Sequence, residues 1–131
     1  MLMNAKGKGS AAERDLVHKF WKAGWAAHRI AGSGSNHYPS PDLLAGNGYR
    51  RIAIECKAVG SANKNLTKKE VDELVEFAQK FGAEAWIGVR FNHQEWLFLP
   101  VDDLRKAEKS YGVSLTLAQK KGLTFAELIE S

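Results

Sequence analysis

The sequence has very little cysteine and no long hydrophobic run. Cys56 is its single cysteine, which excludes an intrachain disulfide. No stretch approaches the roughly 18 consecutive apolar residues that a membrane-spanning helix needs, and no segment resembles a secretory signal. We therefore expect a cytoplasmic protein that does not associate with membranes.

Two common kinds of site are missing as well. No Cys and His spacing suggests zinc, and no glycine-rich loop of the Walker type suggests ATP. A chain of 131 residues, 44% hydrophobic and 26% charged, is long enough for one globular domain with a proper core. We expect residues 1–131 to form that domain, with 1–9 as a flexible basic tail carrying Lys6 and Lys8. The formal net charge of +4 permits an anionic partner without requiring one.

Helix and strand signals alternate along the chain. The sequence of residues 10–13 is a capping box that predicts a helix ending before Gly24, and residues 67–70 open a second helix that ends before Gly82. Strands are predicted over 25–31, in a hairpin over 42–57, and over 85–91 and 95–99. Shorter helices are predicted over 102–109 and from 124. The sum is an α/β fold, a mixed central sheet of about five strands flanked by helices.

Three charged residues stand in or beside the apolar, strand-like runs of the hairpin, namely Asp42, Glu55 and Lys57. Acidic side chains are rare in such runs because burying an unpaired charge is costly. Two carboxylates and an ammonium are the composition of a divalent-metal site with a charge-stabilising lysine, which predicts a nuclease. Without Asp42, an ordinary surface ion pair would be the favoured interpretation of Glu55 and Lys57. Cys56 is predicted to point to the opposite face, into a core.

The turn of this hairpin predicts how the strands align. Asn47-Gly48 favours a two-residue loop, which pairs residues 46 and 49 and places Asp42 opposite Ala53. Asp42 and Glu55 are then diagonal neighbours on one face, about 7–8 Å apart at the backbone. Carboxylates at that separation can close on one Mg²⁺ ion. One added loop residue would break this alignment.

Glu13 and two arginines allow more than one interpretation. Glu13 can complete the capping box by bonding back to Ser10, or it can reach the metal as a third carboxylate. Arg14 is by default a solvated surface charge. Arg29 ends a strand just before a glycine-serine loop, and either arginine is suited to bidentate phosphate binding.

The helix over 67–81 carries an unusually wide apolar arc, close to 160°. At one edge of this arc lie Phe77 and Phe81, which could meet a symmetry mate across a two-fold axis. The alternative is that both pack under loops of the same subunit.

These segments together resemble the archaeal Holliday-junction resolvases, of the restriction-endonuclease-like superfamily. The matching segments cover nearly the whole chain in order: residues 6–14, Arg29 to Gly34, Pro41 to Ala45, Ile54 to Lys57, Leu74 to Gly82 and Gly112 to Leu115. A carboxylate followed by an acid-x-Lys triplet is common to many metal-dependent nucleases. The arginine, the Ala-Gly-Ser loop and the Glu-Phe helix narrow the resemblance to this family.

The resemblance implies a homodimer that cuts four-way DNA junctions symmetrically in recombination and repair. It implies that Glu13, Asp42 and Glu55 hold Mg²⁺, with Mn²⁺ able to substitute, and that Lys57 stabilises charge at the scissile phosphate. It further assigns DNA contacts to Arg14 and Arg29, with Lys6 and Lys8 in the basic tail. Ser33 is placed near the active site, and Phe77 and Phe81 at the dimer interface. A sliding clamp or another recombination protein is a further expected partner.

Two segments depart from the family pattern. The loop over 34–41 is longer than in some relatives, and residues 58–66 end in Asn65-Leu66 where an aromatic residue is expected. Two other functions stay open, a linear-duplex endonuclease of the same fold and a non-catalytic DNA-binding module. The absence of a target-recognition domain disfavours the first. Carboxylates that would repel phosphates unless a metal intervenes disfavour the second.

Overall fold

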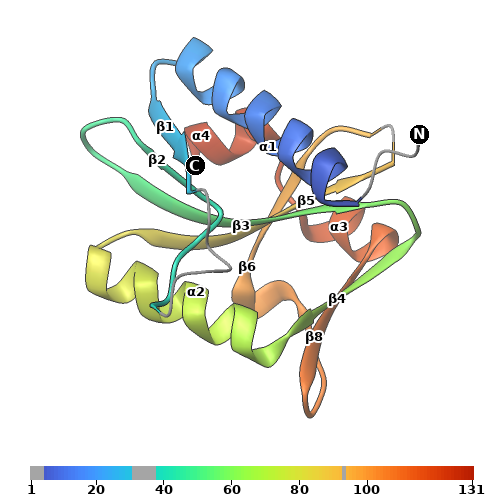
Figure 1. Ribbon diagram of the computed structural model, residues 1–131. Coiled ribbons are helices and arrows are strands. Elements are labelled where there is room, and N and C mark those ends of the chain that lie inside the picture. The colour runs from blue at the N-terminus through green and yellow to red at the C-terminus, as the bar shows by residue number, and fades with distance from the viewer. Residues whose placement is uncertain (1–4, 31–37, 93) are drawn as a thin grey trace.

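A five-stranded sheet, in the order β1-β2-β3-β5-β6, separates two helical layers in the computed structural model, which describes residues 5–30, 38–92 and 94–131 (Figure 1). The side chains are described from residue 9 onward. The strands of this sheet are β1 (Ala26–Arg29), β2 (Leu43–Gly46), β3 (Arg51–Val59), β5 (Glu84–Phe91) and β6 (Leu97–Pro100). β3 and β5 are parallel and the other neighbours are antiparallel. The predicted mixed sheet flanked by helices is therefore confirmed.

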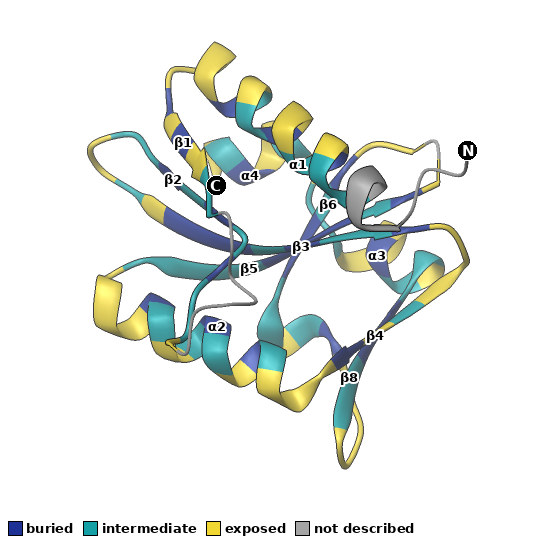
Figure 2. Ribbon diagram, in the orientation of Figure 1, coloured by how far each residue is buried: buried dark blue, intermediate teal, exposed yellow. Residues whose placement is uncertain are grey.

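Helices cover both faces of this sheet. α1 (Ala5–Lys22) and α4 (Phe125–Glu130) pack on one face, and α2 (Lys68–Phe81) packs on the other (Figure 1). α3 (Leu115–Lys121) packs against the same apolar cluster as α2. The alternating side chains of β3 divide between the two cores, because Ile52, Ile54 and Cys56 lie in the α1 cluster and Ala53 lies in the α2 cluster. The buried strands at the centre are visible in Figure 2.

The region after β6 differs from the prediction. Residues 102–109 were expected to form a helix, but they contain the end of a short 3-10 helix, η2 (Val101–Asp103), and the strand β7 (Arg105–Lys106). β7 pairs with β8 (Ser110–Ser114), which pairs in turn with β4 (Asn63–Thr67) in a second, three-stranded sheet. The pairing with β8 and the burial of Leu104 favour the extended chain over the local helix propensity.

The first helix begins earlier than its capping box predicts. α1 starts at Ala5, so residues 5–9 of the predicted basic tail are helical. Ser10 does not act as the N-cap, since its hydroxyl accepts a hydrogen bond from Arg29 Nη2 at 3.1 Å. This contact ties the early turns of the helix to β1, which offsets the low helix propensity of Gly7 and Gly9.

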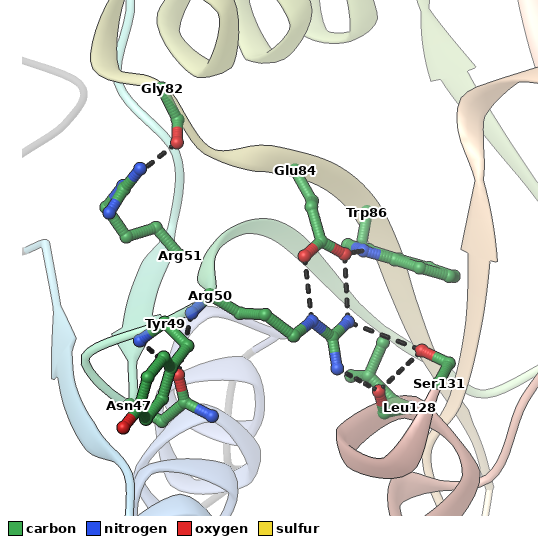
Figure 3. A network of polar contacts seen from close by, with 9 residues as sticks. All are labelled: Asn47, Tyr49, Arg50, Arg51, Gly82, Glu84, Trp86, Leu128 and Ser131. Carbon is green, nitrogen blue, oxygen red and sulfur yellow. Dashed lines mark hydrogen bonds and ion pairs between the residues drawn. The ribbon is translucent and has the colours of Figure 1, made fainter.

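Arg50 ties the C-terminal helix to the sheet. Its guanidinium donates to both carboxylate oxygens of Glu84 at 2.8 and 2.9 Å and to the carbonyl oxygen of Leu128 at 2.9 Å (Figure 3). The same group lies 5.5 Å from the ring centroid of Trp25. A planar bidentate pair of this kind fixes orientation as well as distance, so Arg50 sets the position of α4 against β5.

Candidate active site

The β2–β3 hairpin has a longer loop than predicted. Asn47 Oδ1 accepts hydrogen bonds from the backbone N–H groups of Tyr49 and Arg50 at 2.8 and 2.7 Å, which closes a loop over residues 47–50. The strands then pair Gly46 with Arg51 and Leu43 with Ile54. The predicted pairing of residues 46 and 49 is therefore wrong by two residues.

A shift of two residues preserves the face on which each side chain lies. Continuing the ladder by one position brings Asp42 opposite Glu55, where a diagonal relationship was expected. Asp42 Oδ2 accepts a hydrogen bond from the Cys56 backbone N–H at 2.8 Å, and the Asp42 and Glu55 carboxyl groups are themselves in hydrogen-bonding contact. The structure thus brings the two predicted carboxylates together.

Burial and like charge make both carboxyl groups reluctant to ionise. Burial raises the pKa of Glu55 to about 8, and the neighbouring Asp42 charge adds to the effect. Burial also raises the pKa of Asp42, although the Cys56 N–H and Lys57 oppose it. Without a cation, the pair therefore favours one shared proton near neutral pH. Burial raises the pKa of the Cys56 thiol as well, which keeps it an inert core residue.

Lys57 lies beside this pair on the α2 face of the sheet. Its Nζ is 3.9 Å from Glu55 Oε2, and it forms a closer ion pair with Glu70 Oε2 on α2. Burial by itself would lower the pKa of Lys57, but the hydrogen bond to Glu70 and the nearby carboxylates raise it overall. Lys57 is therefore a charged ammonium, half-buried next to two carboxyl groups.

Glu13 faces an arginine in this structure. Its Oε1 accepts a hydrogen bond from Arg29 Nε at 3.1 Å, so Glu13 does not complete the capping box with Ser10. Burial and then the Asp42 charge raise the pKa of Glu13, which outweighs the lowering effect of Arg29. Among residues 9–30, 38–92 and 94–131, no three His, Cys, Asp or Glu side chains are grouped closely enough to hold a metal ion. Glu13 as a third metal ligand stays a prediction.

The other predicted site residues lie around this cluster or outside the described part. Arg14 is exposed on α1, and Arg29 is half-buried at the end of β1. The side chains of Lys6 and Lys8, and all of Ser33, lie outside the described residues.

The two predicted interface phenylalanines form a stacked pair on α2. The ring centroids of Phe77 and Phe81 are 5.2 Å apart, and 51% of Phe81 is exposed. Two surface grooves adjoin Phe81. One is lined by β1, β2, Trp21 and Arg51, and the other by residues 38, 39, 76, 77 and 80.

Sequence reasoning missed Glu70 as a member of the site. It was assigned only to the capping box of α2, a role that it does have. The strand and helix patterns gave no signal for its contact with Lys57, because that contact depends on how α2 packs across β3.

Among the described side chains, this site therefore combines four carboxylates with two cationic partners. The carboxylates are Glu13, Asp42, Glu55 and Glu70, and the cations are Lys57 and Arg29. A site with this excess of oxygen donors and negative charge fits a divalent cation such as Mg²⁺. Together with the mixed five-stranded sheet, it defines a nuclease of the restriction-endonuclease-like fold.

The chain belongs to one particular family of such nucleases, the archaeal Holliday junction resolvases (Hjc), whose family model matches residues 4–131. It is 42% identical over 129 residues to the crossover junction endodeoxyribonuclease Hjc of Archaeoglobus fulgidus, covering 93% of this chain and 95% of that protein. The Hjc of Sulfolobus acidocaldarius is 36% identical, over 97% of this chain and 90% of that protein.

A solved structure agrees with this assignment. The 1.6 Å structure of the Archaeoglobus fulgidus Hjc, a Holliday junction resolvase, superimposes with a TM-score of 0.85 at 41% sequence identity. The match covers 92% of this chain and 98% of that one. The fold and the sequence therefore identify the same family.

Proposed function

We propose that the protein resolves four-way DNA junctions by metal-dependent hydrolysis, making paired symmetric nicks in homologous recombination and repair. The observation that carries the proposal is the contact between Asp42, which directly precedes β2, and Glu55 of β3, with the Lys57 ammonium beside them. We expect the whole of residues 1–131 to act as one nuclease domain. It would work in the cytoplasm, with a sliding clamp or other recombination protein as an expected partner.

Asp42 and Glu55 are the residues that would hold Mg²⁺, or Mn²⁺ in its place. Their raised pKa values support this role, because a divalent cation replaces the shared proton and relieves the repulsion between the two carboxylates. Glu13 would complete the ligand set on leaving Arg29. Such an ion would supply Lewis-acid chemistry for the hydrolysis of the phosphodiester.

The chain's own cations would act on the DNA. The Lys57 ammonium would stabilise the negative charge that develops on the scissile phosphate. Arg29, released from Glu13, would bind a phosphate of the backbone in bidentate fashion, and the exposed Arg14 would contact a neighbouring one. Lys6 and Lys8 would add phosphate contacts from the start of α1, with Ser33 near the cleavage site.

Two copies of this site are needed for symmetric cuts. We propose that Phe77 and Phe81 lie in the interface of a homodimer with two-fold symmetry. The exposed side chains of Trp21, Tyr38 and Phe81 line the two grooves together, and an exposed apolar patch of this kind is typical of an interaction surface. Replacing Phe81 with Glu should convert the dimer to a monomer in sedimentation analysis. A wild-type monomer at all concentrations would contradict the interface.

The decisive experiment compares DNA substrates and one isosteric variant. The protein and its Asp42→Asn variant are incubated with a four-way junction and with linear duplex, with and without Mg²⁺. We expect the wild type to cut only the junction, and only with Mg²⁺, and the variant to bind it without cutting. Equal cutting of both substrates would favour the linear-duplex endonuclease, and binding without cutting by the wild type would favour the DNA-binding module. Unchanged cutting by Asp42→Asn would refute the metal-site assignment.

A further inference from the structure

Glu70 is the one carboxylate of the site that comes from α2. Its two oxygens have separate partners. Oε2 forms the ion pair with Lys57, and Oε1 accepts hydrogen bonds from the backbone N–H and the hydroxyl of Thr67 at 3.2 and 3.1 Å. Glu70 therefore connects the start of α2 to the lysine of the active site.

We propose that Glu70 is a positioning residue, which holds the Lys57 ammonium in place for the hydrolysis of the phosphodiester. This inference rests on the proposed function and adds to the same site a residue that acts through Lys57.

Lys57 needs such a partner because its side chain is long and flexible. A lysine ammonium sits on a four-carbon stem and loses considerable rotamer freedom when it is held in one place. Glu55 lies 3.9 Å from Nζ, which is too far for a hydrogen bond. In the proposed function, Glu55 would also bind the divalent cation. Glu70 is then the carboxylate that remains available to fix the ammonium.

Glu70 is itself held firmly. The Thr67 hydroxyl accepts from the Glu70 backbone N–H at 3.0 Å, which completes a reciprocal capping box. Thr67 is the last residue of β4 and pairs with Ser110 of β8. The carboxylate is therefore anchored between a helix start and a second sheet, so its second oxygen presents a fixed acceptor to Lys57.

The chain contains a matched control for this role. Thr124 and Glu127 form a capping box at the start of α4 with the same two reciprocal contacts, at 2.8 and 3.2 Å. This second box lies on the opposite helical layer from α2, away from Lys57 (Figure 1). Glu70→Gln and Glu127→Gln therefore both alter a reciprocal capping box. The first also alters the hydrogen bond from the Thr67 hydroxyl and the ion pair with Lys57.

The experiment measures junction cleavage with Mg²⁺ by the full chain and these two variants. We expect Glu70→Gln to lower kcat about tenfold, the usual size of effect for a partner that orients an active-site group, with KM for the junction changed less than about twofold. Glu127→Gln should keep the wild-type kcat and KM. Thermal unfolding of both variants checks that the cap change affects stability equally.

A double-mutant cycle separates positioning from a general structural role. In a Lys57→Ala background, under single-turnover conditions, Glu70→Gln should cause no further loss of rate, because its effect passes through Lys57. The same tenfold loss in that background, or a Glu70→Gln enzyme indistinguishable from Glu127→Gln, would overturn the proposal. Either result leaves the proposed function intact if the wild type resolves junctions, whereas a wild type that does not cut them refutes the proposed function itself.

Discussion

Two clusters of charged residues near β3 differ in how their charges balance. At the start of the strand, Arg50 meets the single carboxylate of Glu84 in a bidentate pair (Figure 3). Further along, the cluster around Glu55 has an excess of carboxylates over cations. The same type of side chain, on neighbouring strands, is thus placed in opposite electrostatic surroundings.

The pKa values express this difference. The hydrogen bonds from Arg50 hold the pKa of Glu84 below its usual value of 4.5, whereas burial beside Asp42 raises the pKa of Glu55 to about 8. The Arg50 cluster is therefore satisfied by the protein alone. The Glu55 cluster is satisfied only when a proton or a cation is added, which is typical of a functional site.

The largest expected effect distinguishes the two glutamates by activity. Glu55→Gln should lower the rate of junction cleavage about a thousandfold, a loss of roughly 4 kcal/mol of transition-state stabilisation, because the variant loses a charged ligand. Glu84→Gln is the matched control and should keep the wild-type rate. Single-turnover cleavage with Mg²⁺ measures both. Equal rates for the two variants would remove the functional distinction between the clusters.

The second effect is a pH dependence of stability without metal. Because the folded-state pKa of Glu55 lies above its ordinary value of 4.5, the folded protein binds more protons than the unfolded chain between about 4.5 and 8. The free energy of unfolding should therefore fall by up to about 5 kcal/mol as the pH rises through this window, at about 1.4 kcal/mol for each pH unit. Urea unfolding in EDTA at several pH values measures it.

Glu55→Gln should flatten this pH dependence, and Mg²⁺ at pH 8 should stabilise the wild type more than the variant. Glu84→Gln should leave the slope above pH 4.5 unchanged, because the lowered pKa of Glu84 affects stability only as the pH falls below that value. A wild type that becomes more stable between pH 5 and 8 in EDTA would contradict the charge excess.

A smaller effect is expected from breaking the balanced cluster. Arg50→Ala should lower the free energy of unfolding by about 2 kcal/mol. This loss is smaller than the loss expected for a fully buried ion pair, because Glu84 is partly solvated. Arg51→Ala, which removes one exposed hydrogen bond to the Gly82 carbonyl, should lower it by less than about 1 kcal/mol. Cleavage per folded molecule should stay unchanged in both. A lower rate in Arg50→Ala would mean that the two clusters are coupled.

The smallest effect concerns the edge of the Arg50 cluster. Ser131 accepts a hydrogen bond from Arg50 Nη2 at 3.3 Å in an exposed position. Ser131→Ala should therefore change the free energy of unfolding by no more than about 0.5 kcal/mol, measured by the same urea titration. A loss as large as that of Arg50→Ala would mean that the stabilising effect of Arg50 comes from its contact with Ser131. We assign that effect to the ion pair with Glu84 instead.

The sequence predicted the five-stranded sheet well, because its strands and the α2 helix carry strong local patterns. Gly24 and Gly82 end their helices with positive φ angles of 88° and 83°, as their positions suggest. Prediction failed where pairing outweighed local signals, as in the small sheet β4-β8-β7 and its strand at Arg105–Lys106. Leu104 is buried only because residues distant in the chain cover it.

The hairpin error is informative because it left the candidate site intact. The Asn47 side chain closes a four-residue loop by bonding two backbone amides, which adds two residues to the predicted turn. Since side chains alternate with a period of two, Asp42 and Glu55 still share a face. The prediction that these two carboxylates share a face therefore depended on the alternation of side chains along β3, and the predicted turn type was not needed for it.

The sequence by itself determined the main candidates for the chemistry, Asp42, Glu55 and Lys57, because carboxylates and a lysine are conspicuous in or beside apolar strands. Tertiary structure alone decided their partners. Arg29 reaches Glu13 and Ser10 across the gap between β1 and α1, and Glu70 reaches Lys57 from α2. Such contacts join segments whose separation in the chain follows no local period, so only the packing of the helices on the sheet fixes them.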